Sequence, residues 1–250
     1  MKQELIPDFA TGPLDRYRKN ASFNWKKLKV FLEREEVIKY ANEFYEELTK
    51  HPILCPSLLT PTLDDARHNT VKKLYTLLSI PGIQSAYMSE VDKAVAISTA
   101  LFNLDTSTMV KMSVTTALFA TTLMSMGSER HTSYVQDLLA GKISGCFCLT
   151  EIAHGTNARG MRTQATYDVN TKEFILHSPD FKAAKCWAGG LGQSATHAAV
   201  YAQLITPDEI QRGLHTFVVP VRDPHSMLPY PGIVVGDMGE KAGLNGVDNG

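Results

Sequence analysis

The stretch CFCLTEIAHGTNARG (residues 146–160) stands where the pattern of the chain changes from helical to strand-like. Alternation within GCFCLTE predicts a strand that places Cys146 and Cys148 on one face as small buried side chains. A Gly-Thr-Asn turn follows, and such a turn can present backbone N–H groups to an anion or a carbonyl group. The residues alone leave two interpretations open: a loop that holds a ligand, and a capped turn that only joins two layers.

Upstream of this stretch, residues 20–140 have a helical pattern. In the first run, apolar residues recur every three or four positions, which predicts one helical run with Ser22 as its N-cap and Pro52 at its end. Thr62 is predicted to cap the next helix. A long, weakly charged segment rich in Ala, Thr and Met predicts one or two helices that are buried on most sides. A short helix that ends at Gly141 is predicted to follow.

Downstream of Gly141, short segments rich in β-branched and aromatic residues alternate with turn residues. Five or so strands without a long helix between them predict an antiparallel sheet or barrel, and TYDVNTKEFIL (residues 166–176) predicts a hairpin. We therefore predict an α+β fold, with an N-terminal helical domain at residues 1–140 and a middle β-domain at residues 141–250. The strands are expected in ISGCFCLTE, QATYDVNTKEFILHS, AAVYAQLI, HTFVVPVRD and GIVVGD.

Composition and charge argue against several classes of partner. Of 250 residues, 44% are hydrophobic and 20% are charged, as in a soluble globular protein with a sizeable core. The formal net charge is −1 and no basic patch is concentrated, so no nucleic acid partner is expected. No apolar run reaches about 18 residues, so no membrane span is expected. The four cysteines lack the spacing of a zinc site, so no metal is expected, and reduced thiols favour an intracellular compartment.

Three other patterns are weaker chemical signals. Ser194 and His197 stand close in sequence, but no G-x-S-x-G motif supports hydrolase chemistry. Glu151 and His154 have the spacing of two metal ligands on a helix, yet a satisfied polar loop is the preferred interpretation because no third ligand is evident. GGLGQSA (residues 189–195) contains G-x-G-x-x-A without the strand and helix of a dinucleotide-binding unit. Its glycines would instead let a flat ligand or a neighbouring backbone approach closely.

Several segments, in the same order, resemble acyl-CoA oxidases and the related acyl-CoA dehydrogenases. FCLTEIAHGTNARGMRTQATYD is similar to their Thr-Glu-x-x-x-Gly-Thr/Ser-Asn/Asp motif. The resemblance covers essentially the whole chain. The sequences of the segments HSPDF, AAK and RDPHSMLPYPG are most similar to the branched-chain (pristanoyl) type of oxidase. Further matching segments are FATGPLDRYRKNASFNWKKLKVFLE, GSERH, EFILHSPDFKAAKCWAGGLGQSATHAAVYAQL, GLHTFVVPVRDPHSMLPYPGIVVGDMGEKAG and NGVDNG.

This resemblance implies a fold and a reaction. The implied fold has an N-terminal helical domain, an antiparallel β-barrel-like middle domain and C-terminal helical domains, the last absent from this chain. The implied reaction converts an acyl-CoA to a trans-2-enoyl-CoA in peroxisomal fatty-acid β-oxidation: a carboxylate base removes the α-proton, a hydride passes to FAD, and O2 reoxidises the flavin to give H2O2. The family's base lies in the C-terminal helices, so no catalytic residue is expected here and Glu151 is not given that role. A homodimer is implied at full length.

Motif matching carries the family's site onto particular residues. Thr150 and Gly189 would contact FAD, and Trp187 and Gly190 would flank the isoalloxazine. Cys186 departs from the bulky aromatic residue usual before that tryptophan, which would widen the pocket wall or loosen flavin packing. The residues expected to bind acyl-CoA are Gly155 and Thr156, and no metal ligand is expected.

Two alternative functions remain open at this level. An acyl-CoA dehydrogenase would pass its electrons to a carrier flavoprotein, although GGLG replaces the Ile-Thr-Asn-like segment of the dehydrogenases. A truncated product would bind flavin, acyl-CoA or a partner without catalysis, because the base is missing. We therefore expect no acyl-CoA-dependent peroxide from this chain alone.

Overall fold

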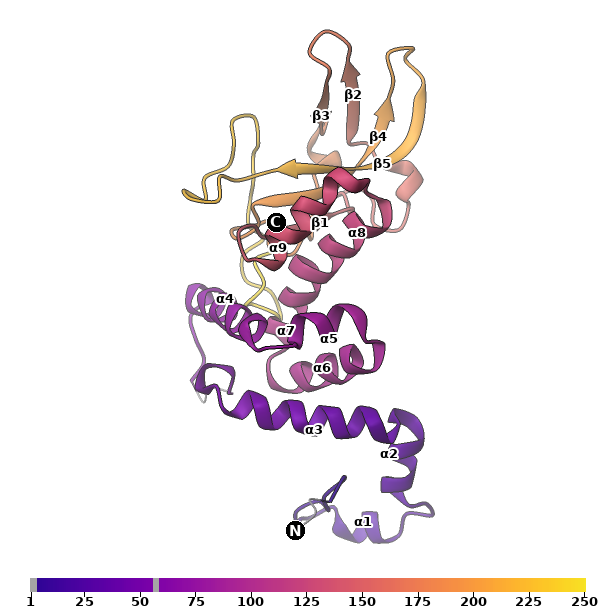
Figure 1. Cartoon of the computed structure of the whole chain (residues 1–250), viewed down its shortest axis with the longest axis vertical. Helices are drawn as coiled ribbons and strands as arrows, with labels where there is room; N and C mark the ends of the chain where they lie inside the picture. Colours follow the sequence, from indigo (N-terminus) through magenta and orange to yellow (C-terminus); the bar gives the residue numbers. More distant parts are fainter. Residues whose placement is uncertain (1–3, 56–58) are drawn as a thin grey trace. The chain divides into compact units, whose positions relative to one another are not determined.

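The computed structural model describes residues 4–55 and 59–250 (Figure 1). By its internal contacts the chain divides into two units. One unit comprises Met1–Leu58 and Thr76–Thr106, and the other comprises Leu59–Tyr75 and Ser107–Gly250. The change from helices to strands occurs near residue 140, as predicted, while the predicted domain limit at that residue stays a prediction.

The first unit is helical. Within it α3 packs against α6, and both helices bury apolar side chains, among them Phe44 and Leu48 of α3 and Ile97 and Leu101 of α6. Its elements are α1 (Asp15–Lys19), α2 (Trp25–Glu33), α3 (Glu35–Thr49), the 3₁₀ turn η1 (Pro52–Leu54), α5 (Ile83–Ser89) and α6 (Val91–Leu104), and α4 (Leu63–Ser79) is divided between the units.

The prediction of one uninterrupted helical run near the N-terminus is wrong in two details. Arg34 has φ of +67°, and this left-handed residue separates α2 from α3. The apolar spacing continues across the break, so periodicity does not reveal it. Asn24 caps α2 in place of Ser22, because its Oδ1 accepts a hydrogen bond from the Lys27 N–H at 3.0 Å.

The helices of the second unit follow the sequence prediction closely. Thr62 caps α4, with its Oγ1 accepting from the Asp65 N–H at 3.2 Å, and Gly141 has φ of +71° just after the last helix. The weakly charged segment forms α6 of the first unit and a further helical stretch that contains a π-helical turn. The elements are α7 (Thr106–Met112), the π-helical η2 (Ser113–Leu118), α8 (Phe119–Met126), the 3₁₀ turn η3 (Glu129–His131) and α9 (Thr132–Leu139).

The stretch Thr106–Met126 is the one helix among the described residues that is long and apolar enough to cross a membrane by length and composition. Half of its most apolar window is buried inside the protein, as in the core helix of a soluble protein, so it is weak support for a span. The sequence shows no uninterrupted apolar run of about 18 residues here, because threonines and serines interrupt the apolar residues.

Five strands form a mixed sheet, and this corrects the antiparallel prediction. The first half of β4 pairs in parallel with β1, its second half pairs in parallel with β2, and β5 runs antiparallel along it. The described strands form an open sheet and no closed barrel. The strands are β1 (Gly145–Cys148), β2 (Gln164–Asp168), β3 (Glu173–His177), β4 (His197–Ile205) and β5 (Gln211–Pro220), with the short turns η4 (Ala158–Gly160) and η5 (Phe181–Ala183) between them.

The error has a physical cause. Parallel strands need a long connection, and here the chain reaches β4 from β1 and from β2 through loops and the β2–β3 hairpin rather than through a long helix. The hairpin prediction is confirmed, because β2 and β3 pair antiparallel. The strand predicted in GIVVGD is wrong: that segment joins no sheet among the described residues, and Val234 within it is 99% exposed.

The core between the sheet and its helices is made of small residues. Cys146 and Cys148 are both buried on one face of β1, as predicted, with their Sγ atoms 3.6 Å apart. Gly145 lies against the ring of Phe119 in α8, where a β-carbon would come within 2.3 Å of that ring. Close packing of this kind positions the loop that follows β1.

Candidate functional site

The loop after β1 is organised around the buried carboxylate of Glu151. Its oxygens accept hydrogen bonds from the N–H of Arg162 (2.9 Å), the N–H and Oγ1 of Thr163 (2.8 and 2.7 Å) and the Nζ of Lys185 (3.2 Å). Burial alone would raise the pKa of Glu151, but these donors and the lysine charge hold it below its ordinary value. The carboxylate is therefore ionised and fully engaged. The prediction of a satisfied polar loop is confirmed.

Hydrogen bonding joins this loop to the segment that contains Trp187. The Cys186 N–H donates to the carbonyl oxygen of Thr150 at 3.0 Å, and the backbones of Glu151 and Lys185 form an isolated antiparallel β-bridge. Thr150 is half-buried, whereas Trp187 has φ of +64° and is 58% exposed. Trp187 is therefore not a core residue of this chain.

The two residues predicted to bind acyl-CoA lie further along the loop. Gly155 and Thr156 are exposed, and the turn is completed by Asn157, whose side chain accepts a hydrogen bond from the Gly160 N–H at 3.2 Å.

The predicted close approach at the glycines is confirmed for protein backbone. Ala188 and Gly250 exchange two backbone hydrogen bonds of 3.1 Å, and the Gly190 N–H donates to the Asp248 carbonyl oxygen at 2.9 Å. Gly189 therefore lies opposite Asn249 at a position without hydrogen bonds, and its own N–H and C=O point away from the C-terminal segment.

Helical residues press on the same glycines from another side. A β-carbon on Gly189 would come within 2.5 Å of Val114 Cγ2, and one on Gly190 within 3.0 Å of Thr115 Cγ2. Gly190 also has φ of +90°, which favours glycine. The π-helical turn η2 carries both contacting side chains, and such turns recur at functional sites.

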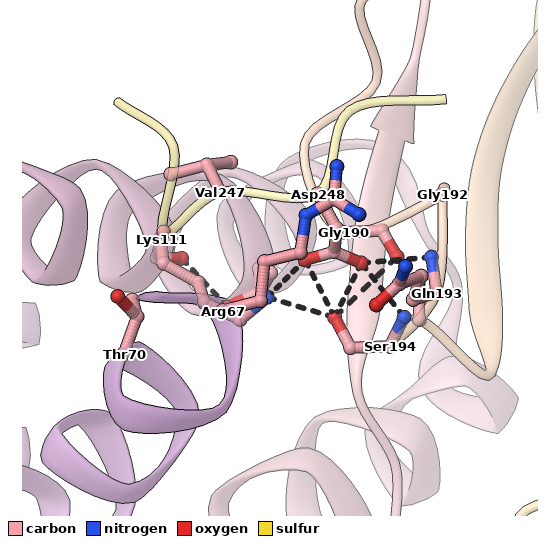
Figure 2. A network of polar contacts seen from close by, with 12 residues as sticks. Arg67, Thr70, Lys111, Gly190, Gly192, Gln193, Ser194, Val247 and Asp248 are labelled. Carbon is pink, nitrogen blue, oxygen red and sulfur yellow. Dashed lines mark hydrogen bonds and ion pairs between the residues drawn. The ribbon is translucent and has the colours of Figure 1, made fainter. Parts of the chain in front are cut away.

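We define the glycine loop as residues 189–194. A buried polar network holds the C-terminal end of this loop (Figure 2). Asp248 Oδ2 accepts hydrogen bonds from the N–H groups of Gln193 and Ser194, both at 2.8 Å, while Oδ1 pairs with the Nζ of Lys111. Lys111 also donates to Ser194 Oγ at 2.8 Å. Burial would raise the pKa of Asp248, but the lysine charge and the N–H donors hold it below its ordinary value.

This network also explains the Ser194 and His197 pair. The Ser194 hydroxyl is engaged by Lys111 and Asp248, whereas the Nδ1 of His197 lies 3.1 Å from Thr196 Oγ1. The two side chains take part in different contacts and form no catalytic pair. Within residues 4–55 and 59–250, no group of three or more His, Cys, Asp or Glu side chains is arranged to hold a metal ion.

Comparison with known proteins places this geometry in a family. The acyl-CoA dehydrogenase middle domain matches residues 146–250. Human peroxisomal acyl-coenzyme A oxidase 3 is 41% identical over 98% of this chain and 35% of its own length, and Caenorhabditis elegans acyl-coenzyme A oxidase acox-3 is 35% identical over 95% of this chain and 35% of its own length. The chain belongs to the acyl-CoA oxidase family. It spans about a third of the length of these relatives.

Solved acyl-CoA oxidase structures share the fold. Acyl-CoA oxidase 3 of Yarrowia lipolytica superposes with a TM-score of 0.82, at 32% identity, over 94% of this chain and 34% of its own. Acyl-CoA oxidase 2 of Caenorhabditis elegans, bound with FAD, ascaroside-CoA and ATP, superposes with a TM-score of 0.80, at 26% identity, over 98% of this chain and 37% of its own. An acyl-CoA oxidase-like fold of helices and a mixed sheet is thereby confirmed.

Two residues of this oxidase-family chain were not singled out from its sequence. Lys111 is a single charge in an apolar helical segment, and Asp248 lies in NGVDNG, which was noted only for its resemblance. A lone lysine among apolar residues was the available signal, since such a charge must find a buried partner or reach solvent. The assignments of Thr150, Trp187, Gly189 and Gly190 to FAD, and of Gly155 and Thr156 to acyl-CoA, stay predictions.

Proposed function

We propose that this chain is the N-terminal and middle part of a peroxisomal, FAD-dependent acyl-CoA oxidase. The whole enzyme would convert an acyl-CoA to the trans-2-enoyl-CoA and reduce O2 to H2O2 in fatty-acid β-oxidation. The observation that carries the proposal is the hydrogen bond from Cys186 to Thr150, because it brings the Thr-Glu loop beside the Trp187 and glycine segment. The names of the relatives, the human peroxisomal oxidase among them, support the same reading.

The residues present fit a flavin. Gly189 is buried and directs its N–H and C=O away from the C-terminal segment, and we assign these two groups to the polar edge of an isoalloxazine. Trp187 is exposed and offers a ring face, and the Thr150 hydroxyl lies on the adjoining loop. When bound, FAD supplies the hydride acceptor and the reaction with O2. The chain's own residues orient it.

The acyl-CoA is assigned to the exposed turn beyond the flavin loop. Gly155 and Thr156 would hold the substrate through backbone N–H groups and a hydroxyl. Glu151 takes no proton in this scheme, because its carboxylate already accepts from two backbone N–H groups, one hydroxyl and Lys185. The base is assigned to a part of the enzyme outside these residues, and the whole enzyme is proposed to be a homodimer.

The experiment compares two proteins in an acyl-CoA-dependent peroxide assay: the protein at its full natural length, and the chain of residues 1–250. We expect peroxide and bound FAD with the first and no peroxide above a no-enzyme control with the second. Turnover by residues 1–250 would overturn the placement of the base. Reduction of a carrier flavoprotein without peroxide would identify a dehydrogenase instead.

A pair of threonine variants tests the flavin assignment in the full-length protein. Thr150→Ala removes the proposed flavin contact, whereas Thr171→Ala removes an exposed hydroxyl in the turn of the β2–β3 hairpin. We expect weaker FAD binding by about 1 kcal/mol from the first variant and no change from the second. Equal FAD affinity in both variants would contradict the assignment of Thr150.

A further inference from the structure

We propose that Lys111 and Asp248 are positioning residues that set the backbone of the glycine loop, and through it the direction of the flavin-contacting groups of Gly189. This inference rests on the proposed function. Asp248 meets the proposed flavin contact Gly190 through its backbone carbonyl oxygen only. The side chains of Lys111 and Asp248 contact each other and residues 193–194, so each side chain would act through the loop.

A single residue holds most of the loop's backbone. The carbonyl oxygen of Asp248 accepts from the N–H groups of Gly190 (2.9 Å) and Gly192 (3.2 Å), and its carboxylate accepts from those of Gln193 and Ser194 (2.8 Å each). Four N–H groups of a six-residue loop therefore end on Asp248. Because the backbones of residues 188 and 190 are tied to the same segment, the orientation of the peptide groups of Gly189 follows from where Asp248 lies.

Lys111 determines where that carboxylate lies. Its side chain is 2% exposed, as is that of Asp248, and its Nζ contacts both the carboxylate and Ser194 Oγ (Figure 2). It belongs to α7, which runs directly into the π-helical turn that presses Val114 and Thr115 against the glycines. The ion pair therefore connects the position of α7 and η2 to the position of the glycine loop.

The energetics favour a positioning role over a purely stabilising one. Desolvation of two charges offsets most of their attraction, so a buried ion pair is often no more stable than apolar residues of similar volume. Such a pair does specify geometry, because an unpaired charge in the same place is strongly unfavourable. We infer that the pair excludes other registers of helix and loop.

The test uses the protein at its full natural length and measures three quantities: the Kd for FAD, the visible absorption spectrum of the bound flavin, and Tm. Lys111→Met leaves the carboxylate without its cation. We expect its Kd for FAD to rise at least about tenfold, or about 1.4 kcal/mol, with a changed flavin spectrum. Adding Asp248→Asn removes the unpaired charge but keeps an oxygen for the loop N–H groups, so the double variant should recover much of the affinity.

Leu138→Ala is the matched control. Leu138 is a buried residue of α9 in the same unit, and α9 packs against α8 and η3. We expect Leu138→Ala to lower Tm by an amount comparable with Lys111→Met and to change the Kd for FAD less than about twofold. If Lys111→Met does not fold, Lys111→Arg is measured in its place, and a changed flavin spectrum is again expected.

The outcomes separate this inference from the proposed function. A wild-type protein that neither binds FAD nor forms peroxide overturns the proposed function. The positioning role alone is overturned by a different pair of results. The wild-type protein binds FAD and forms peroxide, and the Lys111 variant has the same FAD affinity and flavin spectrum as the Leu138→Ala control at the same Tm.

Discussion

Replacing Glu151 by alanine should destabilise the second unit by about 3–5 kcal/mol, the range found when one partner of a buried ion pair is removed. The structure explains the size. Lys185, with its side chain 9% exposed, would lose its anion, and the N–H groups of Arg162 and Thr163 would lose their acceptor. Each unsatisfied buried donor costs about 1–3 kcal/mol, although water molecules that enter the space left by the carboxylate offset part of that cost. Glu151→Gln keeps one acceptor oxygen, so we expect roughly half the loss.

Urea unfolding measures this change in the unit that contains the loop. The chain has two tryptophans, so Trp25→Phe leaves Trp187 as the only reporter. The expected loss corresponds to a fall in Tm of roughly 6–20 °C for a protein of this size. Glu173→Ala, which removes an exposed carboxylate on β3, is the control and should change the free energy of unfolding by less than about 0.5 kcal/mol.

Two results would refute the reasoning. A loss below about 1 kcal/mol for Glu151→Ala would mean that the buried donors find other partners at little cost. Equal losses for the alanine and glutamine variants would mean that the acceptor oxygen is not what stabilises the loop. Either result would remove the physical basis for treating Glu151 as a structural carboxylate.

Three further predictions follow from the same unit. Gly145→Ala should cost about 1–3 kcal/mol in urea unfolding, since its β-carbon would overlap the buried ring of Phe119, and Phe119→Leu should recover part of that loss; full stability of the single variant would contradict the close packing. Because the pKa of Asp248 is lowered in the folded protein, its contribution is present above about pH 4 and lost as the pH falls further, so acid unfolding of Asp248→Asn should show a weaker pH dependence. The hydrogen bond to Cys148, with burial, raises the pKa of Cys146, so a thiol reagent at neutral pH should label neither cysteine until urea is added.

Local patterns were sufficient for the elements whose residues meet their neighbours in sequence. The cap at Thr62, the end of α9 before Gly141, the β2–β3 hairpin and the shared face of the two strand cysteines all depend on residues a few positions apart. The prediction failed where the same local pattern fits two structures. The apolar spacing of α2 and α3 runs through Arg34 without a sign of the left-handed turn.

Strand pairing could not be predicted in the same way. Period-two alternation identifies a strand, but it carries no information on direction. The sheet was predicted to be antiparallel, whereas β1 and β2 pair in parallel with β4. The β-branched residues of GIVVGD satisfied the local rule for a strand and found no partner among the described residues.

The sequence by itself determined the family, the order of helices and strands, and the loop that follows β1, because each depends on motifs and periodicities within short segments. Only the tertiary structure showed that Lys111 and Asp248, 137 residues apart, form one buried pair that ends the glycine loop. It also showed that Glu151 is held by donors from two later segments. Whether a charged side chain is buried and paired depends on residues that are distant in the chain. The free-energy cost of burying the charge depends on those partners, so a local sequence pattern cannot predict it.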